Sequence, residues 1–381
     1  MKQKKLRVFE AFAGIGAQAA ALSRTNLNYE IVGISDWFID AIECYNAIHC
    51  QNCTEVEIPS TKEEILKELK KFTFSADSVH PYDISRMSED KLRDLYVAHK
   101  NSKNYGSVCD INAKDLPDFD LLVYSFPCQD LSTGGLGKGM KKGSGTRSGL
   151  LWEIERMLKD LNKLNRLPEY LLLENVKTIT APSNKPDLLE WLAFLESIGY
   201  QNDECLYLNA LDFGVPQDRE RAFIVSHLGE KLNIKEKIRK KPRHYEFNDF
   251  FRNDYTNPTL KAEADIAQLY PTPSRLQMWQ INGRELNENT TVRTITCNMD
   301  RTNCAGLFPY CGAKGESFRR PTIREAFLLM GFTEDEFCRT LSLEFSYRKM
   351  NKLIGNSIVV NVLQEIFMVM FQDKYGKGKK K

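Results

Sequence analysis

Short apolar runs alternate with helical patterns along the first 227 residues, and this alternation limits the folds open to the chain. The apolar runs cover 6–9, 29–34, 119–124, 170–173 and 222–226, and the helical patterns begin near 18 and cover 39–48, 150–164 and 188–198. A strand that is apolar throughout is typical of a parallel sheet covered by helices on both faces. The sequence therefore predicts a doubly wound α/β fold.

Two stretches interrupt this alternation. Residues 54–107 are charged and helix-prone, which indicates an insertion between sheet elements, and residues 228–318 are irregular and rich in Asn, Thr, Arg and Pro. The apolar helix expected at 358–371 indicates that the end of the chain returns to the first domain. We therefore expect a catalytic domain at 1–227, a small second domain at 228–318 and a returning segment at 319–381.

Composition limits the surroundings in which this chain works. Ten cysteines without a secretory signal favour free thiols in a reducing cytoplasm, and no apolar run approaches the ~18 residues of a membrane span. The net charge is only +2, so contact with nucleic acid has to come from local patches such as 231–243, which holds seven Lys or Arg residues. We expect a cytoplasmic protein without a membrane partner.

The motif Ser-Phe-Pro-Cys-Gln at 125–129 ends the third apolar run. Proline fixes the backbone there, and the end of a buried strand projects the Cys128 thiol outward, where it can act as a nucleophile. A lone cysteine in an apolar stretch is more often a core residue. The nucleophile reading is favoured by motifs that accompany it in order along the chain, at 12–16, 36–37, 110–111, 174–176, 217–221 and 355–357.

The glycine turn at 12–16 indicates where a cofactor binds. Its position between a strand and a helix lets the backbone approach a ligand closely. Ala19 stands where a dinucleotide fingerprint would have its third glycine, which disfavours NAD and FAD. Asp36, at the end of the second strand, can accept two ribose hydroxyls, Trp37 can stack on adenine, and Asp110 can accept the adenine amino group. Together these features favour S-adenosyl-L-methionine.

The remaining motifs fit methylation at cytosine C5, which is a poor nucleophile until a thiolate adds to C6. Cys128 supplies the thiolate, and Glu174, a carboxyl at a strand end, can protonate N3. Arg219 and Arg221 lie two residues apart in an extended segment, so we expect both to face the base and Glu174. One arginine can donate to O2 while the other holds the carboxylate.

We expect two regions of the chain to bind the nucleic acid, a flexible glycine-rich segment and an irregular region with basic side chains. The segment 134–149 contains seven glycines interleaved with Lys138, Lys141, Lys142 and Arg147, which indicates a lid that closes over the substrate and contacts phosphates. A thiol cannot reach C6 within a stacked duplex, so the target base must be flipped out. The irregular 228–318 region, with its basic side chains, is then expected to read base edges in the major groove.

These motifs, in this order, resemble the DNA (cytosine-5) methyltransferases of bacterial restriction–modification systems. The stretches 8–17, 124–132 and 143–156 are especially similar to the CpG methyltransferases of mollicutes. The resemblance implies an S-adenosylmethionine-dependent, Rossmann-like sheet of seven strands with a small target-recognition domain. It also implies that Cys128 is the nucleophile, Glu174 the N3 partner and Arg221 the O2 donor.

The resemblance completes the expected site. The expected cofactor-binding residues are Phe12, Gly14, Gly16, Asp36, Trp37, Asp110, Ile111, Pro127, Asn356 and Ser357, and the expected DNA-binding residues are Gln129, Ser132, Arg147, Gln217, Lys240, Arg243 and Thr294. Asp36 stands where the family usually has Glu, which keeps the ribose contact but shortens its reach. The partners that we expect are double-stranded DNA and a cognate restriction endonuclease. We expect a monomer that is associated with the bacterial nucleoid when it is bound to DNA.

Three alternatives remain at this point. An RNA cytosine-5 methyltransferase of the tRNA-modifying branch would usually have a second proline where this chain has Phe126. A non-catalytic homologue would not need to retain Cys128, Glu174 and Arg221. A zinc module could use His49-Cys50-Gln-Asn-Cys53 with Cys44, but Cys297, Cys304 and Cys311 do not supply a second ligand pair of metal-binding spacing, so no metal is expected.

Overall fold

The computed structural model describes residues 4–53, 55–131, 139–240, 245–282, 285–287, 290–297, 299 and 305–377. The chain forms two compact units. The first comprises Met1–Leu208, Glu220–Arg239 and Gln364–Lys381, and the second comprises Asn209–Arg219 and Lys240–Leu363. This division differs from the expected one, because the chain enters the second unit twice and returns to the first only from residue 364.

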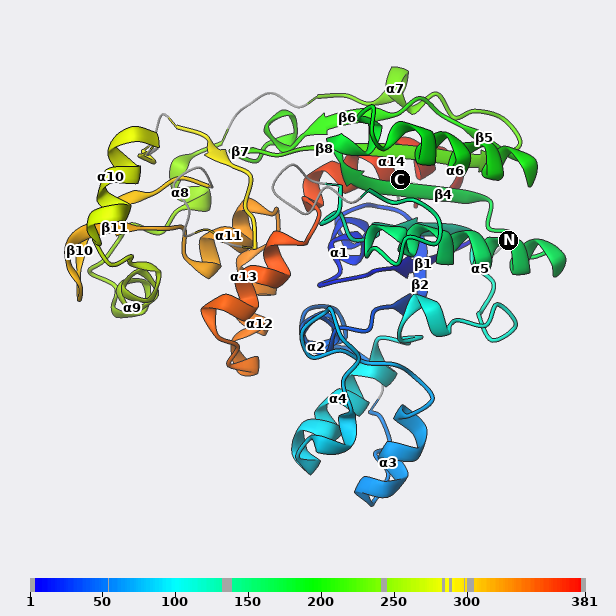
Figure 1. Cartoon of the computed structure of the whole chain (residues 1–381), viewed down its shortest axis with the longest axis horizontal. Coiled ribbons are helices and arrows are strands. Elements are labelled where there is room, and N and C mark those ends of the chain that lie inside the picture. The colour runs from blue at the N-terminus through cyan, green and yellow to red at the C-terminus, as the bar shows by residue number, and fades with distance from the viewer. Residues whose placement is uncertain are drawn as a thin grey trace. The chain divides into compact units, whose positions relative to one another are not determined.

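A seven-stranded sheet forms the centre of the first unit (Figure 1). Its order is β2-β1-β3-β4-β8-β5, and β6 pairs with β8. The first four strands in this order are parallel, whereas β8 runs antiparallel to both β4 and β5. The predicted α/β fold and the seven strands are confirmed. The strands are β1 (Leu6–Ala11), β2 (Tyr29–Ser35), β3 (Leu121–Tyr124), β4 (Tyr170–Val176), β5 (Tyr200–Asn202), β6 (Leu206–Asn209) and β8 (Glu220–Leu228).

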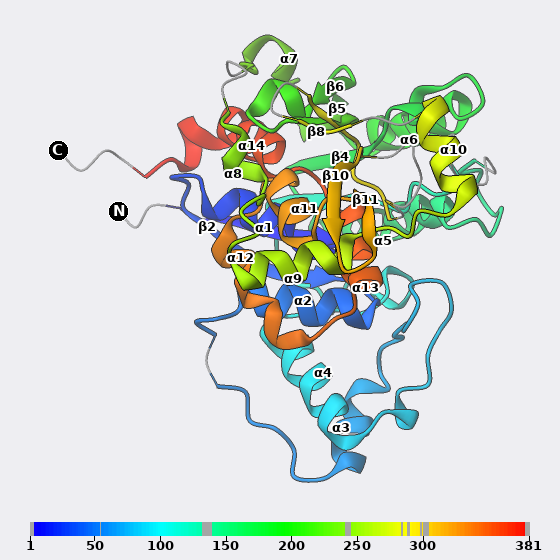
Figure 2. The same ribbon diagram turned by 90° about the vertical axis from the view of Figure 1, so that its left-hand side faces the viewer.

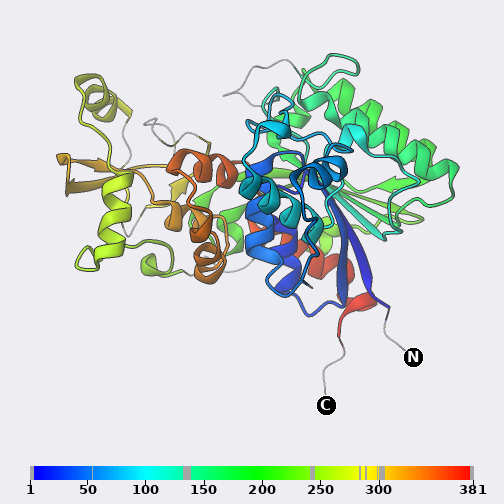
Figure 3. The same cartoon turned by 90° about the horizontal axis from the view of Figure 1, so that it is seen from below.

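Helices cover the sheet because its strands are apolar on both faces. Phe9, Leu122 and Leu173 share one core with Met157 and Trp191, which come from α5 and α6. The end of α14 lies beside β1 and β2 (Figure 3), where the Asn28 N–H donates to the Tyr375 carbonyl. The helices of this part are α1 (Ala17–Ser23), α2 (Ile39–His49), α5 (Leu151–Lys163), α6 (Lys185–Ser197), α7 (Ile234–Lys237) and α14 (Val360–Tyr375), with short 3-10 helices η3 (Ser148–Leu150) and η4 (Lys177–Thr180).

The expected insertion after α2 is helical and has a small core of its own. It contains α3 (Lys62–Leu69), η1 (Ile84–Arg86), α4 (Glu89–Asn101) and η2 (Val108–Asp110). A capping box of Thr61 and Glu64 begins α3. Ile65, Leu69 and Leu95 pack with Ile42 of α2, so the insertion rests on that helix. Figures 1 and 2 both show α3 and α4 beyond α2, away from the sheet.

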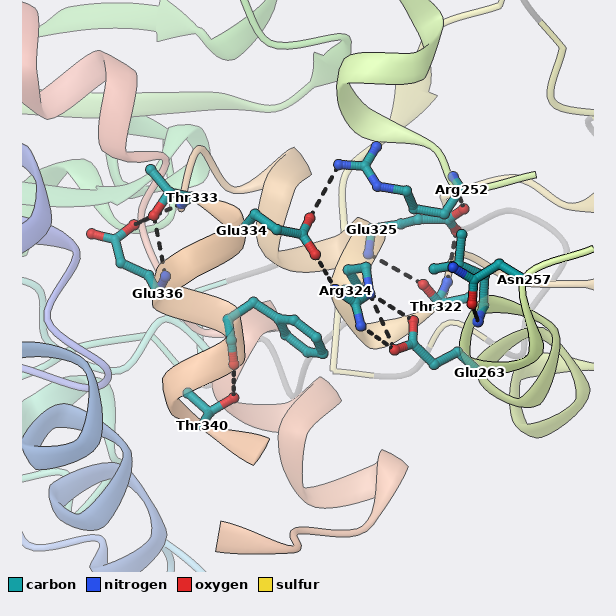
Figure 4. A network of polar contacts seen from close by, with 12 residues as sticks. Arg252, Asn257, Glu263, Thr322, Arg324, Glu325, Thr333, Glu334, Glu336 and Thr340 are labelled. Atoms are coloured by element: carbon teal, nitrogen blue, oxygen red, sulfur yellow. Dashed lines mark hydrogen bonds and ion pairs between the residues drawn. The ribbon is translucent and has the colours of Figure 1, made fainter. Parts of the chain in front are cut away.

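The second unit is built from short helices, a hairpin and a two-stranded parallel pair. Its elements are η5 (Ala210–Phe213), β7 (Gln217–Asp218), α8 (Phe247–Phe250), α9 (Pro258–Ala267), α10 (Pro273–Asn282), β9 (Val292–Arg293), β10 (Phe308–Gly312), β11 (Gly315–Arg319), α11 (Ile323–Leu329), α12 (Glu334–Arg339), η6 (Leu341–Leu343) and α13 (Tyr347–Gly355). Charged networks join these elements. In Figure 4, Arg324 of α11 lies between Glu263 of α9 and Glu334 of α12.

The C-terminal helical segment is unusually apolar. Among the described residues, the helical stretch Tyr347–Tyr375 contains an 18-residue window with a mean hydropathy of 1.6, which is long and apolar enough to cross a membrane by length and composition alone. This stretch exceeds the apolar runs expected from the sequence. However, 56% of that window is buried inside the protein, as in a core helix of a soluble protein.

Candidate active site

The glycine turn at the carboxyl end of β1 has backbone angles that favour glycine. Gly14 and Gly16 have φ values of 57° and 78°, and Gly16 is the residue before α1. A Cβ atom on Gly16 would lie 2.3 Å from His49 Nε2 and 2.7 Å from a ring carbon of Tyr45. Phe12 also has a positive φ, of 57°. The turn therefore depends on glycine for its backbone angles and close packing, as at strand ends where backbone approaches a ligand.

Asp36 lies at the carboxyl end of the neighbouring strand β2 and is tied to the glycine turn. Its carboxylate accepts hydrogen bonds from the backbone N–H groups of Gly14 (2.8 Å) and Phe38 (2.9 Å). Burial raises the pKa of Asp36, while these backbone donors act in the opposite direction. Each oxygen retains a lone pair after accepting one hydrogen bond, so the carboxylate can still accept ribose hydroxyls.

The other adenosine-binding candidates lie near this edge of the sheet or in the insertion. Trp37 is half-buried and follows Asp36, and its carbonyl accepts the Ser75 N–H (2.7 Å). Asp110 is exposed at the end of η2, where it accepts a hydrogen bond from Thr73 N–H (2.9 Å). Ile111 is buried, and its carbonyl accepts from Arg156 (2.9 Å).

Glu174, near the end of β4, is held from both sides by neighbouring strands. It is 5% exposed, and its carboxylate accepts a hydrogen bond from the Ser125 hydroxyl just beyond β3. On the other side, Arg221 Nε of β8 lies 3.6 Å from Glu174 Oε1. The adjacent Asn175 donates to the Phe126 carbonyl (3.0 Å). Glu174 is therefore anchored to the same segment that carries Cys128.

Cys128 is partly exposed, in a turn fastened to the start of the segment that leads into α5. The Ser148 hydroxyl donates to the Pro127 carbonyl (2.6 Å). The buried Asp130 carboxylate accepts from the backbone N–H groups of Arg147 (2.9 Å) and Ser148 (3.2 Å). These contacts hold the thiol-bearing turn in place at the sheet edge, and Cys128 as a whole residue is partly exposed.

The prediction that Arg219 and Arg221 face the same way is wrong. Arg219 is 4% exposed and donates to the carbonyls of Ile295 (2.7 Å), Gly355 (3.1 Å) and Ser357 (2.7 Å), all in the second unit. The two-residue spacing fails because β7 ends at 218 and β8 begins at 220, so no single strand carries both arginines. Arg221 alone of the two forms the ion pair with Glu174.

The side chain of Gln217, an expected DNA contact, is bonded inside the protein. Its side chain is fully buried, its amide nitrogen donates to the Leu329 carbonyl (2.6 Å), and its amide oxygen accepts from Ile295 N–H (2.9 Å). The amide is used to join β7 to neighbouring segments of the second unit. Thr294 is half-buried next to this junction and donates to the Asp218 carbonyl (2.8 Å).

The C-terminal cofactor candidates belong to the second unit. Asn356 is exposed and its side-chain oxygen accepts from the Cys297 thiol (3.1 Å), whereas Ser357 is buried with its carbonyl bonded to Arg219. A Cβ on the preceding Gly355 would lie 2.4 Å from the Cys297 backbone nitrogen, so only glycine fits there. This turn is consequently fixed by Arg219 and by close backbone packing.

The expected DNA-binding residues lie in different parts of the protein, and some are outside the described residues. Arg147 contacts the Gln129 side-chain oxygen and donates to the Ser78 carbonyl (2.8 Å) in the insertion, beside the Cys128 turn. Lys240 forms an ion pair with Asp212 (2.8 Å) in the second unit. Ser132 and Arg243 lie outside the described residues, as do Lys138 and the glycines at 134, 135 and 137 of the expected lid.

Three residues of this site were missed by the sequence reasoning. Ser125, Asp130 and Ser148 hold Glu174 and the Cys128 turn, although Ser125 lies within the cysteine motif and Asp130 directly follows it. Ser125 and Asp130 could have been found from the sequence, because hydroxyl and carboxylate side chains stand next to the predicted nucleophile. Among the residues that the structure describes, no group of three or more His, Cys, Asp or Glu side chains could hold a metal ion.

Known proteins resemble this chain in sequence and in fold. A family model described as C-5 cytosine-specific DNA methylase matches residues 84–372. The orphan methyltransferase M.SssI of Spiroplasma monobiae is 40% identical, over 96% of this chain and 97% of its own length. The type II methyltransferase M2.ScrFI of Lactococcus lactis subsp. cremoris is 34% identical, over 97% and 100%.

Solved structures are similar in fold at low sequence identity. The crystal structure of the S. pombe Dnmt2 methyltransferase matches with a TM-score of 0.62 and 19% identity, over 97% of this chain and 99% of that one. A putative DNA modification methyltransferase encoded within an E. coli prophage matches with a TM-score of 0.54 and 14% identity, over 97% and 99%. At such identities the likeness concerns the fold alone.

Proposed function

This chain belongs to the C-5 cytosine-specific DNA methylase family, and we propose that Cys128, Glu174 and Arg221 carry out its methyl transfer to cytosine. The family and the likeness to a mollicute methyltransferase confirm what the motifs predicted. The protein is therefore an enzyme that methylates cytosine C5 in DNA. The same family match favours DNA over the RNA alternative and an enzyme over a non-catalytic homologue.

The observation that carries the proposed mechanism is the anchoring of Glu174 to the Cys128 segment. Ser125 and Arg221 bind the Glu174 carboxyl from two sides, and Ser125 lies three residues before the partly exposed thiol. The Cys128 thiolate adds to cytosine C6 and forms a C–S bond as the C5=C6 π bond opens, while Glu174 in its protonated form gives a proton to N3. Arg221 lies at the same carboxyl and can donate to O2.

The activated ring then completes the substitution. Addition at C6 shifts the electrons of the C5=C6 π bond toward C5, which becomes the nucleophile. S-adenosyl-L-methionine, held by the residues described below, would supply the methyl group from its sulfonium and leave as the thioether S-adenosylhomocysteine. Loss of the C5 proton to a base and departure of the Cys128 thiolate restore the ring double bond. Because C6 is buried in a stacked duplex, the substrate cytosine is flipped out of the helix first.

The residues of the first unit fit S-adenosyl-L-methionine as this donor. The positive-φ glycines of the 12–16 turn lie at the end of β1, and the Asp36 carboxylate accepts the Gly14 N–H beside them. In this proposal Asp36 binds the ribose hydroxyls, and Trp37 and Asp110 bind the adenine. Phe12, Ile111 and Pro127 complete the proposed binding set of the first unit.

The proposed substrate is duplex DNA, which Gln129, Arg147, Thr294 and Lys240 contact together with Ser132 and Arg243. We also propose a cytoplasmic monomer that associates with the nucleoid through its DNA. The name of the relative M2.ScrFI, a type II methyltransferase, favours a companion restriction endonuclease, whereas the orphan name of M.SssI favours none. Gel filtration of the purified protein tests whether it is a monomer in solution.

Substitution of the nucleophile tests the mechanism directly. Cys128→Ala should abolish transfer of labelled methyl groups from S-adenosyl-L-methionine to duplex DNA, because alanine cannot bond to C6. Binding of S-adenosyl-L-methionine, measured by calorimetry, should stay within about twofold of wild type, since Cys128 is not among its proposed ligands. Methyl transfer that persists in purified Cys128→Ala would refute the covalent route.

A further inference from the structure

Cys50 and Cys53 form a tight turn at the end of α2. Cys50 is the C-cap residue of that helix, and its N–H donates to the Asn46 carbonyl (3.0 Å). The Cys53 N–H donates to the Cys50 carbonyl (3.2 Å), which closes a four-residue turn. Such a turn keeps its first and last Cα atoms within about 7 Å, close to the ~4.4–6.8 Å that a disulfide spans.

The two thiols of this turn interact and differ in their exposure to solvent. The Cys53 thiol reaches the Asn101 carbonyl (3.8 Å), and its proximity to the Cys50 thiol contributes to the raised pKa of Cys50. Cys53 is exposed, whereas Cys50 is half-buried, and its burial raises the pKa of the Cys50 thiol. A reagent in solvent therefore meets Cys53 first, and Cys50 stands next to it as the second thiol.

The turn is coupled to the glycine turn through one side chain. His49 precedes Cys50, and its Nε2 lies 3.0 Å from the Ile15 carbonyl. The ring also packs against Gly16 so closely that a Cβ there would lie 2.3 Å from Nε2. Because no free space separates His49 from Gly16, a displacement of Cys50 moves the ring relative to the backbone of the 12–16 turn.

We propose that Cys50 and Cys53 are a reversible oxidation site, at which a low-molecular-weight disulfide forms an intramolecular Cys50–Cys53 bond and weakens binding of S-adenosyl-L-methionine at the 12–16 turn. The Cys53 thiolate attacks one sulfur of the small disulfide and releases one small thiol. The Cys50 thiolate then displaces the second, so two protein S–H groups become one S–S bond and two small thiols are formed.

This inference rests on the proposed cofactor site, and closing the bond is what disturbs that site. The new bond draws Cys50 toward Cys53 and pulls on the adjacent His49. Disulfides in cytoplasmic proteins are mostly transient and redox-sensing, which agrees with a bond formed only under oxidation. Unlike Cys128, each cysteine of this pair has another cysteine three residues away in the sequence, close enough to form a disulfide.

Oxidation of the full-length protein tests the proposal. The chain is incubated with oxidised glutathione, its peptides are mapped by mass spectrometry, and S-adenosyl-L-methionine binding is measured by calorimetry. We expect the 50–53 peptide to lose two hydrogen atoms, and the dissociation constant to rise by about tenfold. Dithiothreitol should reverse both changes.

Two variants separate this site from the other exposed thiols. Cys53→Ser should bind the cofactor as the reduced wild type does and ignore the oxidant, whereas Cys338→Ser, which lacks an exposed thiol of the second unit, should respond as wild type. Absence of the 50–53 disulfide, or its formation with an unchanged dissociation constant, would overturn the proposal.

A second readout keeps the test independent of the proposed function. Hydrogen exchange of the 12–16 backbone should change on oxidation of wild type and not of Cys53→Ser. If the reduced protein fails to bind S-adenosyl-L-methionine, the cofactor assignment fails, and hydrogen exchange still decides whether the cysteine pair is coupled to the turn. Unchanged exchange in the oxidised protein would end the coupling.

Discussion

Glu174 receives its geometry from two residues beside β4: Ser125, just beyond β3, and Arg221 of β8. The carboxyl is 5% exposed, so its position is fixed by these partners more than by solvent. A carboxyl that must meet N3 of a flipped base has to be pre-oriented, because a poorly placed acid loses proton-transfer efficiency. Glu174 is therefore the residue at which a small chemical change should have a large kinetic effect.

Glu174→Gln should slow methyl transfer by ~10²–10⁴-fold, because glutamine keeps the size of the side chain and lacks the acidic proton. The rate is measured in single-turnover assays at saturating cofactor. Glu220→Gln is the matched control, since Glu220 lies nearby in β8 and forms only a surface ion pair with Lys177 (2.6 Å). Equal rates for both variants would remove Glu174 from the mechanism.

His99 in α4 is a buried base within the insertion. Its ring is 3% exposed and packs against Phe72 and Phe74 at centroid distances of 4.5 and 5.6 Å. Burial lowers the pKa of His99 to about 4. Between pH 4 and the ordinary value near 6.5, the unfolded chain therefore binds a proton that the folded chain does not.

Lowering the pH from 7 to 4 should reduce the free energy of unfolding by up to about 3 kcal/mol through His99 alone. The stability that depends on keeping His99 neutral is fully present above pH 6.5, and it declines as the pH falls toward 4. Urea denaturation of wild type and His99→Phe across this range isolates it, because phenylalanine keeps the aromatic packing without the titration. A constant difference between the two proteins at all pH values would contradict the assignment.

At the scale of elements, strands and helices of the sheet were predictable because their apolar runs must be buried on both faces. The runs at 29–34 and 170–173 correspond to β2 and β4, and the pattern at 150–164 corresponds to α5. The insertion was predictable from its charge. What failed was the orientation of Arg219 relative to Arg221, because period-2 reasoning assumes one continuous strand and β7 and β8 are separate.

The buried ion pair of β11 and α11 is an element-scale contact that sequence could not indicate. Arg319 and Glu325 have 0% exposed side chains and lie 2.8 Å apart. Glu325 also accepts from the N–H groups of Arg252 and Thr322 (2.8 Å each). Figure 4 shows Glu325 among Thr322, Arg252 and Arg324. The two charges depend on each other because no water is available to solvate either one alone.

Arg319→Met should destabilise the protein by about 3–5 kcal/mol, because it leaves the Glu325 carboxylate buried without its cation. Thermal and urea unfolding measure the loss. The double variant Arg319→Met/Glu325→Gln should recover much of it, since glutamine still accepts the Thr322 N–H and carries no charge. A double variant less stable than the single one would contradict the role assigned to the uncompensated charge.

At the scale of the whole molecule, the division of the chain was the least predictable feature. From changes in composition, the sequence predicted domain boundaries at 228, where the chain becomes irregular, and at 319, ahead of its apolar C-terminal helix. The structure instead assigns Asn209–Arg219 to the second unit and returns the chain only within α14. The reason is that Gln217 and Arg219 bind backbone groups of Ile295, Leu329 and Gly355, and long-range hydrogen bonds of this kind leave no compositional trace.

The most direct test of the enzyme's proposed chemistry uses a DNA duplex with 5-fluorocytosine at the methylated position. After methyl transfer, fluorine at C5 cannot leave as a proton does, so the Cys128–C6 bond should persist as a covalent protein–DNA adduct. We predict an adduct that forms only with S-adenosyl-L-methionine and maps to Cys128 by mass spectrometry. No adduct with an active enzyme, or an adduct that persists in Cys128→Ala, would contradict the account.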